Sequence, residues 1–275
     1  MLFATMLTVL AAVLHVTWNL IVKSGEDRLI AMWGVTLAGT VVSAPLLVVL
    51  GPPEPSVVLY IGASAVIHVC YSLGLAQAYQ RGDLSVAYPL ARGAAPLLTA
   101  AGGALFLRDT LTPLGYVGIA LASLGLLVTG GVGASSGAIL WALMTSIAVA
   151  VYTLVDAAGV RTADESLRYV IGVFVGHSLL LTLAVLAGRP SAELVSALRA
   201  SKLAFLGGGV ASVAAYGLVL TAVRFAPVAY VATLRESSVI LGALAGWLLL
   251  HESFGFRRTA GAVVALAGIA LVILR

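Results

Sequence analysis

Residues 81–92 read RGDLSVAYPLAR, and residues 224–235, which lie 143 positions further along the chain, read RFAPVAYVATLR. The same shift aligns arginines, glycines and acidic residues within and after these stretches without a gap. The aligned pairs are Arg81 and Arg224, Arg92 and Arg235, Leu98 and Leu241, Gly103 and Gly246, Asp109 and Glu252, Gly118 and Gly261, Ala122 and Ala265, and Gly125 and Gly268. The chain is therefore predicted to consist of two related halves, residues 1–133 and 134–275.

The composition is typical of a membrane protein. Of the 275 residues, 61% are hydrophobic and 9% are charged, whereas soluble domains are about 25% charged. The formal net charge of +4 comes from Lys and Arg residues that mostly interrupt apolar runs. Short loops between membrane helices explain this pattern better than a nucleic-acid partner does. We therefore expect the lipid bilayer, and no nucleic acid, as a partner.

Apolar segments of about twenty residues, each long enough to cross a bilayer, recur along the chain. The ten predicted spans are residues 2–22, 29–50, 57–79, 84–107, 112–131, 137–157, 169–188, 203–223, 228–250 and 256–274. Because each half has an odd number of spans, the second half would enter the membrane from the opposite side, as in many secondary transporters. The predicted fold is thus all-α: a polytopic membrane protein whose ten transmembrane helices form two inverted five-helix repeats.

Three sequence features resemble a known family. They are the aromatic end of the first span at Trp18 and Asn19, and the LRD and LHE blocks that end at Asp109 and Glu252. Together with the two halves, they resemble the ten-helix, EamA-type branch of the drug/metabolite transporter superfamily. Residues 78–96, AYQRGDLSVAYPLARGAAP, are also similar to a subgroup associated with phosphonate-use genes. The resemblance implies a multi-pass transporter of the cytoplasmic (inner) membrane.

Two arginines and one carboxylate fall well inside predicted spans. Such groups cost about 2.5–3.5 kcal/mol each on insertion scales, so they are functional candidates. A two-fold axis between the halves would bring Arg92 and Arg235 to one cavity, where guanidinium groups bind carboxylate or phosphate-like groups bidentately. This predicts a small anionic or zwitterionic substrate. A structural role for both arginines, paired with Glu236 or with carbonyl groups at helix ends, is the alternative. Glu236 is either an ion-pair partner or a proton-coupling site.

Two prolines distinguish the fourth span from the ninth. Pro89 and Pro96 each remove a backbone donor and disturb the helix one turn before them. The aligned positions in the second half are Ala232 and Val239. The pattern therefore predicts a bend in the first half only.

Other polar side chains occur at helical spacing. His15, Trp18 and Asn19 are three and four residues apart and share one face of the first span, the third span carries a similar stripe, and Tyr88 lies one turn before the arginine of the fourth span. Interhelical hydrogen bonding is the structural alternative for these residues. Asp156, at the end of the sixth span, is interpreted as a carboxylate at the membrane interface. The candidate substrate-binding residues are Arg92, Arg235, Tyr88, His15, Trp18, Asn19, His68 and Tyr71.

The sequence favours a transporter over an enzyme. The four histidines lie in separate segments, so no metal site is predicted, and no phosphate-binding glycine loop indicates ATP. No cofactor is expected. The predicted function is secondary transport, as an exporter or proton-coupled carrier, of a small polar metabolite. The competing hypothesis is a membrane-embedded enzyme that acts on a lipid or isoprenoid head group. The matched glycine sets predict close helix packing within a monomer or a homodimer.

Membrane orientation stays open. More Lys and Arg residues fall in the loops on one side, which favours both termini outside the cell. The family resemblance implies that both termini are inside.

Overall fold

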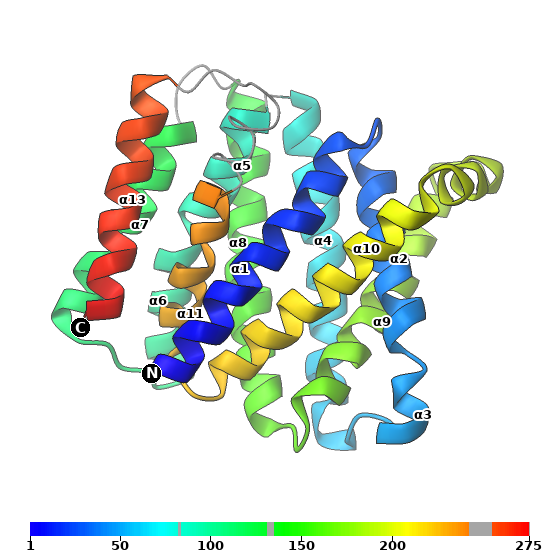
Figure 1. The fold of residues 1–275 in the computed structure, drawn as a ribbon, viewed down its shortest axis with the longest axis horizontal. Coiled ribbons are helices and arrows are strands. Elements are labelled where there is room, and N and C mark those ends of the chain that lie inside the picture. The colour runs from blue at the N-terminus through cyan, green and yellow to red at the C-terminus, as the bar shows by residue number, and fades with distance from the viewer. Residues whose placement is uncertain (82–83, 131–134, 242–254, 275) are drawn as a thin grey trace.

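The computed structural model describes residues 1–81, 84–130, 135–241 and 255–274, without the side chains of Lys23, Tyr79, Arg258 and residues 84–88. These residues are helical, with no strand among them, so the predicted all-α fold is confirmed (Figure 1). The helices are α1 (Leu2–Ser24), α2 (Arg28–Ser43), α3 (Leu46–Leu50), η1 (Pro55–Val57), α4 (Val58–Arg81), α5 (Leu84–Gly93), α6 (Ala95–Phe106), α7 (Pro113–Gly130), α8 (Ser136–Thr162), α9 (Ser166–Leu186), α10 (Ser191–Val223), α11 (Val228–Arg235) and α13 (Phe256–Leu274). Both termini lie at the same end of the molecule, the lower end in Figure 1.

The described helices are those of an integral, multi-pass membrane protein. Five segments are long and apolar enough to cross a bilayer, and they lie in α1, α4, α8, α9 and α10. Further shorter apolar helices occur within α2, α7 and α13. Large apolar side chains cover the outside, with Val48 88% exposed and Leu59 85% exposed. Such side chains suit contact with lipid, where helices satisfy their own backbone groups.

The predicted fourth span is broken into two helices, which confirms the expected irregularity there. α5 ends at Gly93, Ala94 has φ −84° and ψ −19°, and α6 begins at Ala95. Pro96 lies in the first turn of α6, where its missing N–H would have had no partner inside the helix. Pro89 lies inside α5.

The second half has a matching break, so the prediction of a bend in the first half only was wrong. α11 ends at Arg235, Glu236 forms a turn, and residues 237–241 are helical again. The Glu236 N–H donates to the carbonyl of Thr233 at 3.1 Å, and the Glu236 carbonyl accepts from Val239 at 2.9 Å. These three-residue hydrogen bonds satisfy the backbone in a tight turn, so no proline is needed.

The predicted eighth span is part of a longer helix. α10 begins at Ser191 and kinks at Ser201, whose φ of −118° and ψ of 19° are not helical. The segment before the kink projects from the body of the molecule at the right of Figure 1. Arg189 anchors its start, since the guanidinium donates to Glu193 at 2.6 Å and also to Asp27 in the α1–α2 turn.

Small residues let α7 and α13 pack with their backbones in contact. A Cβ atom on Gly125 would lie 2.5 Å from the Gly261 carbonyl oxygen, and one on Gly118 would lie 2.7 Å from the Gly268 carbonyl oxygen. Only glycine allows this approach, so the predicted close packing is confirmed within a single chain. The two helices run in opposite directions (Figure 1). Gly242 and Gly246, the other predicted packing pair, lie outside the described residues.

A polar cluster closes the end of the molecule that carries the termini. Asp109 accepts two hydrogen bonds from Arg161, at 2.9 and 3.0 Å, and one from the Val228 N–H at 2.6 Å. Arg161 also donates to the carbonyl groups of Val223 and Ala226, at 3.1 and 3.2 Å. The first LRD block therefore ends in a carboxylate that joins the α6–α7 loop to α8 and caps the N-terminus of α11.

Candidate functional site

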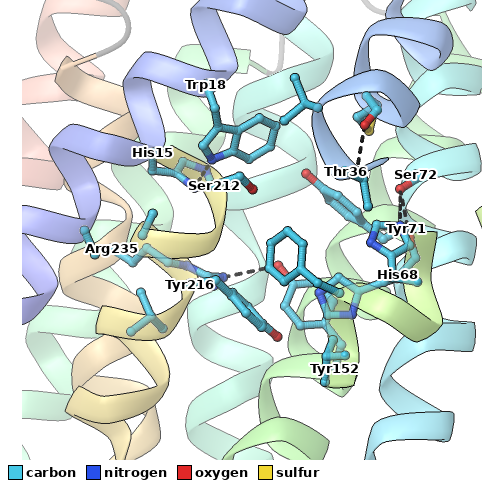
Figure 2. A pocket seen from close by; sticks show the side chains of 18 residues that line it. His15, Trp18, Thr36, His68, Tyr71, Ser72, Tyr152, Ser212, Tyr216 and Arg235 are labelled. Atoms are coloured by element: carbon cyan, nitrogen blue, oxygen red, sulfur yellow. Dashed lines mark hydrogen bonds between the residues drawn. The ribbon is translucent and has the colours of Figure 1, made fainter. Parts of the chain in front are cut away.

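A cavity of about 80 Å³ lies in the middle of the described helices (Figure 2). This volume holds several water molecules, and polar side chains line it. Seven helices contribute: α1, α2, α4, α8, α9, α10 and α11. The lining residues are Ala11, His15, Trp18, Met32, Val35, Thr36, His68, Tyr71, Ser72, Tyr152, Val173, Phe174, His177, Ser212, Ala215, Tyr216, Val219 and Arg235.

Arg235 extends from the last turn of α11 into the cavity, and it is 4% exposed. The C-terminal end of a helix favours a cation, because the carbonyl dipoles point towards it. The Arg235 Nη2 lies 3.5 Å from the Tyr152 hydroxyl, and Figure 2 shows this contact as a dashed line. Its Nε is buried and has no hydrogen-bond partner within the described part of the chain. Among the described residues, no carboxylate forms an ion pair with Arg235.

Arg92 is placed differently from Arg235, because it pairs with Glu236. The Arg92 Nε donates to Glu236 Oε2 at 2.9 Å, and Nη2 donates to Oε1 at 2.6 Å. Both side chains are 1% exposed, and neither lines the cavity. The pair joins the end of α5 to the residue that ends α11, so Glu236 is an ion-pair partner in this structure.

The three candidates on α1 do not share one environment. The Trp18 Nε1 donates to His15 Nδ1 at 3.2 Å, and both rings line the cavity. Asn19 is not a lining residue, and its side chain donates to the His15 carbonyl at 2.8 Å. His15 lies within electrostatic range of both Arg92 and Arg235.

The two candidates on α4 lie on the opposite side of the cavity. The His68 Nδ1 donates to the Ser64 carbonyl at 2.9 Å, and the ring stacks on Tyr152 with centroids 4.0 Å apart. Tyr71 meets Tyr152 edge-on at 5.8 Å. His177 completes this aromatic wall, 5.3 Å from His68. The side chain of the remaining candidate, Tyr88, lies outside the described part of the chain.

Tyr152 and Tyr216 line the cavity but were missing from the predicted site. Tyr152 had a sequence signal, because TWNLIVKSG (17–25) aligns loosely with VYTLVDAAG (151–159) and pairs it with Trp18. Tyr216 has no counterpart signal in the sequence.

The interpretation of Asp156 as an interface carboxylate was wrong. α8 continues beyond it to Thr162, and Asp156 is 0% exposed. The predicted sixth span ended at residue 157, whereas α8 continues to Thr162. The prediction stopped early because Asp156 and Arg161 are polar, although both lie within this continuous helix.

Titratable groups do not form a metal site in the described part of the chain. No group of three or more His, Cys, Asp and Glu side chains is arranged to hold a metal ion among those residues.

Comparisons with known proteins agree with this architecture. A model of the EamA-like transporter family matches residues 136–274. No protein of curated function matches the chain. A solved structure described only as "Crystal structure of protein" superimposes with a TM-score of 0.77, covering 98% of this chain and 98% of that chain at 18% identity. At this identity the likeness concerns the fold alone. Because the family model covers half of the sequence, the chain belongs to the EamA-like transporter family, within the drug/metabolite transporter superfamily.

Proposed function

We propose that the protein is a secondary active transporter of a small anionic or zwitterionic metabolite in the cytoplasmic membrane. The observation that carries this proposal is the unequal pairing of the two arginines. Glu236 compensates the charge of Arg92, whereas Arg235 faces the cavity with no carboxylate beside it among the described residues. Arg235 therefore brings a permanent positive charge to the cavity.

The positive charge of Arg235 favours a solute that carries a negative charge. In a medium of low dielectric, an isolated buried cation is costly unless a counter-charge is bound. A carboxylate, phosphate or phosphonate group on the solute would supply this charge and accept two parallel hydrogen bonds from the guanidinium. The aromatic wall of His68, Tyr71 and Tyr152 would then contact the rest of the solute.

Alternating access would come from two inverted repeats, residues 1–133 and 134–275. The packing of the helices supports this division, because α1 packs on α10 in the way that α8 packs on α4. The sequence alignment pairs α1 with α8 and α4 with α10. The contact between α1 and α10 therefore corresponds to the contact between α8 and α4. The glycine contacts behave alike, since the alignment converts Gly118 against Gly268 into Gly261 against Gly125. Reciprocal contacts of this kind are expected from a two-fold axis.

The broken helices supply the moving parts in this mechanism. In each half a helix stops within one residue of the aligned position, after Gly93 in the first and after Arg235 in the second. Discontinuous helices at the middle of the membrane are typical of transporter sites. Both repeats and the cavity lie in one chain, so a monomer is sufficient.

Counterflow in proteoliposomes tests the proposal. The probes are 2-aminoethylphosphonate, L-alanine and succinate, with choline as the cationic comparison. Arg235→Gln should lower the rate for transported anionic or zwitterionic probes by about 10- to 100-fold, which corresponds to the loss of hydrogen bonds to a charged group. Arg199→Gln is the matched control, because Arg199 is exposed and lies in the projecting segment of α10. Transport of choline alone, or unchanged anion transport in Arg235→Gln, would contradict the proposal.

A further inference from the structure

Asp156 is a fully buried carboxylate behind the cavity wall, and the proposed substrate binding does not use it. It lies in α8, one turn beyond the lining residue Tyr152. The Tyr169 hydroxyl donates to its Oδ1 at 2.8 Å, and the Tyr216 hydroxyl donates to its Oδ2. One carboxylate therefore ties α8 to α9 and α10.

Side chains from three neighbouring helices act on Asp156. α4 provides the Ser64 hydroxyl and the His68 ring, and both act on the carboxylate electrostatically. α9 provides Tyr169 and α10 provides Tyr216. Arg235 of α11 acts electrostatically on His68, and His68 acts in the same way on His177 of α9.

No cation offsets the charge of this carboxylate in the described part of the chain. Asp156 is absent from the ion pairs formed there, in contrast to Glu236, which is held by Arg92. An ionised carboxylate buried without an ion-pair partner is costly, whereas its protonated form is neutral. Protonation of Asp156 therefore removes the cost of burying its charge. Protonation of Glu236 would instead break its ion pair with Arg92.

The neighbours of Asp156 connect it to the water in the cavity. Tyr216 and His68 both line the cavity. Ser64 contacts Asp156 on one side, and its carbonyl accepts from the His68 Nδ1 on the other. The Tyr216 hydroxyl donates to Asp156, so one hydroxyl group separates the buried carboxylate from the cavity.

We propose that Asp156 takes up and releases the proton that drives transport, a role that rests on the proposed secondary transport. A hydronium ion in the cavity loses one proton and becomes water, and an O–H bond forms at Asp156 Oδ2. The Tyr216 hydroxyl then loses its acceptor and must turn away or accept instead. The same O–H bond breaks when the proton leaves to water on the opposite side. Protonation thus weakens the link between α8 and α10 and alters Tyr216, a side chain that lines the cavity.

Infrared difference spectroscopy of the reconstituted full-length protein tests the inference without any solute. Acidification should produce a C=O band of a protonated carboxylic acid that is lost in Asp156→Asn. Asp164→Asn is the matched control, because Asp164 is an exposed carboxylate in the α8–α9 turn. Tyr169→Phe should move the band to higher frequency, because the C=O group at Oδ1 would accept one hydrogen bond fewer. Persistence of the same band in Asp156→Asn, or its absence from the wild type, would overturn the inference.

A transport measurement separates this inference from the proposed function. With any probe that the wild type exchanges, a pH gradient should drive uphill accumulation in the wild type and Asp164→Asn. In Asp156→Asn accumulation should fall to the equilibrium level, while counterflow at equal pH continues. Gradient-driven accumulation in Asp156→Asn would refute the role of Asp156. Failure of the wild type to exchange any probe would instead refute the proposed function, and the infrared band would still report whether Asp156 titrates.

Discussion

Replacing Glu236 by glutamine should destabilise the protein strongly. The carboxylate accepts two hydrogen bonds from Arg92, at 2.9 and 2.6 Å, and both side chains are 1% exposed. Breaking a buried pair by removing one partner costs about 3–5 kcal/mol. At about 1.4 kcal/mol per factor of ten, the folding equilibrium should fall by roughly two to four orders of magnitude.

The two single substitutions should differ in their effect. Arg92→Met leaves Glu236 unpaired, but a carboxylate can take up a proton and become neutral. Glu236→Gln leaves a guanidinium that cannot lose its charge. Arg92→Met should therefore cost less than Glu236→Gln. The double substitution Arg92→Met with Glu236→Leu removes both charges, and it should be within about 1 kcal/mol of the wild type or more stable.

Unfolding by sodium dodecyl sulfate in mixed lipid micelles, followed by circular dichroism, measures these differences at equilibrium. Leu59→Ala is a suitable control, because this side chain is 85% exposed and lies on the outer surface. The reasoning fails if Glu236→Gln unfolds with the wild type, or if the double variant is as unstable as Glu236→Gln.

Three further predictions concern the frame around the site. Gly268→Leu should lose at least about 1–3 kcal/mol of stability, because even its Cβ atom would lie 2.3 Å from the backbone of a neighbouring helix. A thermal melt measures the loss as a lower unfolding temperature. Gly207→Ala is the control and should match the wild type, because a Cβ atom there would have nothing within 4 Å. Asp109→Asn should lose about 1.5–3 kcal/mol from its charged hydrogen bonds, and faster amide exchange at Val228 would reveal the lost cap. Tyr152→Phe should change the counterflow rate less than about threefold, since a contact at 3.5 Å is weak; a larger change would assign the hydroxyl a direct role.

Local sequence properties were sufficient for the helical membrane architecture. Hydropathy over some twenty residues sets whether a helix can cross a bilayer, and this requires no knowledge of its neighbours. The spacing of Gly118, Gly125, Gly261 and Gly268 likewise predicted close packing, because a face of small residues is a property of one helix. The Pro96 break was also local, since proline cannot donate a backbone hydrogen bond.

The break at Glu236 could not be predicted in the same way. Nothing around it resembles a helix breaker, and its turn is held by three-residue backbone hydrogen bonds and by an ion pair with α5. A carboxylate in the sequence gives no indication of which cation it will meet. The burial of Asp156 inside α8 was likewise missed, because its hydroxyl donors come from other helices.

The sequence by itself placed Arg92 and Arg235 in apolar segments, at positions related by one shift of 143 residues. It could not distinguish their roles, because two aligned residues are predicted to have the same role. Only the tertiary structure decided that Arg92 meets Glu236, a residue 144 positions away, and that Arg235 faces the cavity. The physical reason is that a buried charge acts through its nearest partner in space, and that partner is chosen by helix packing rather than by position along the chain.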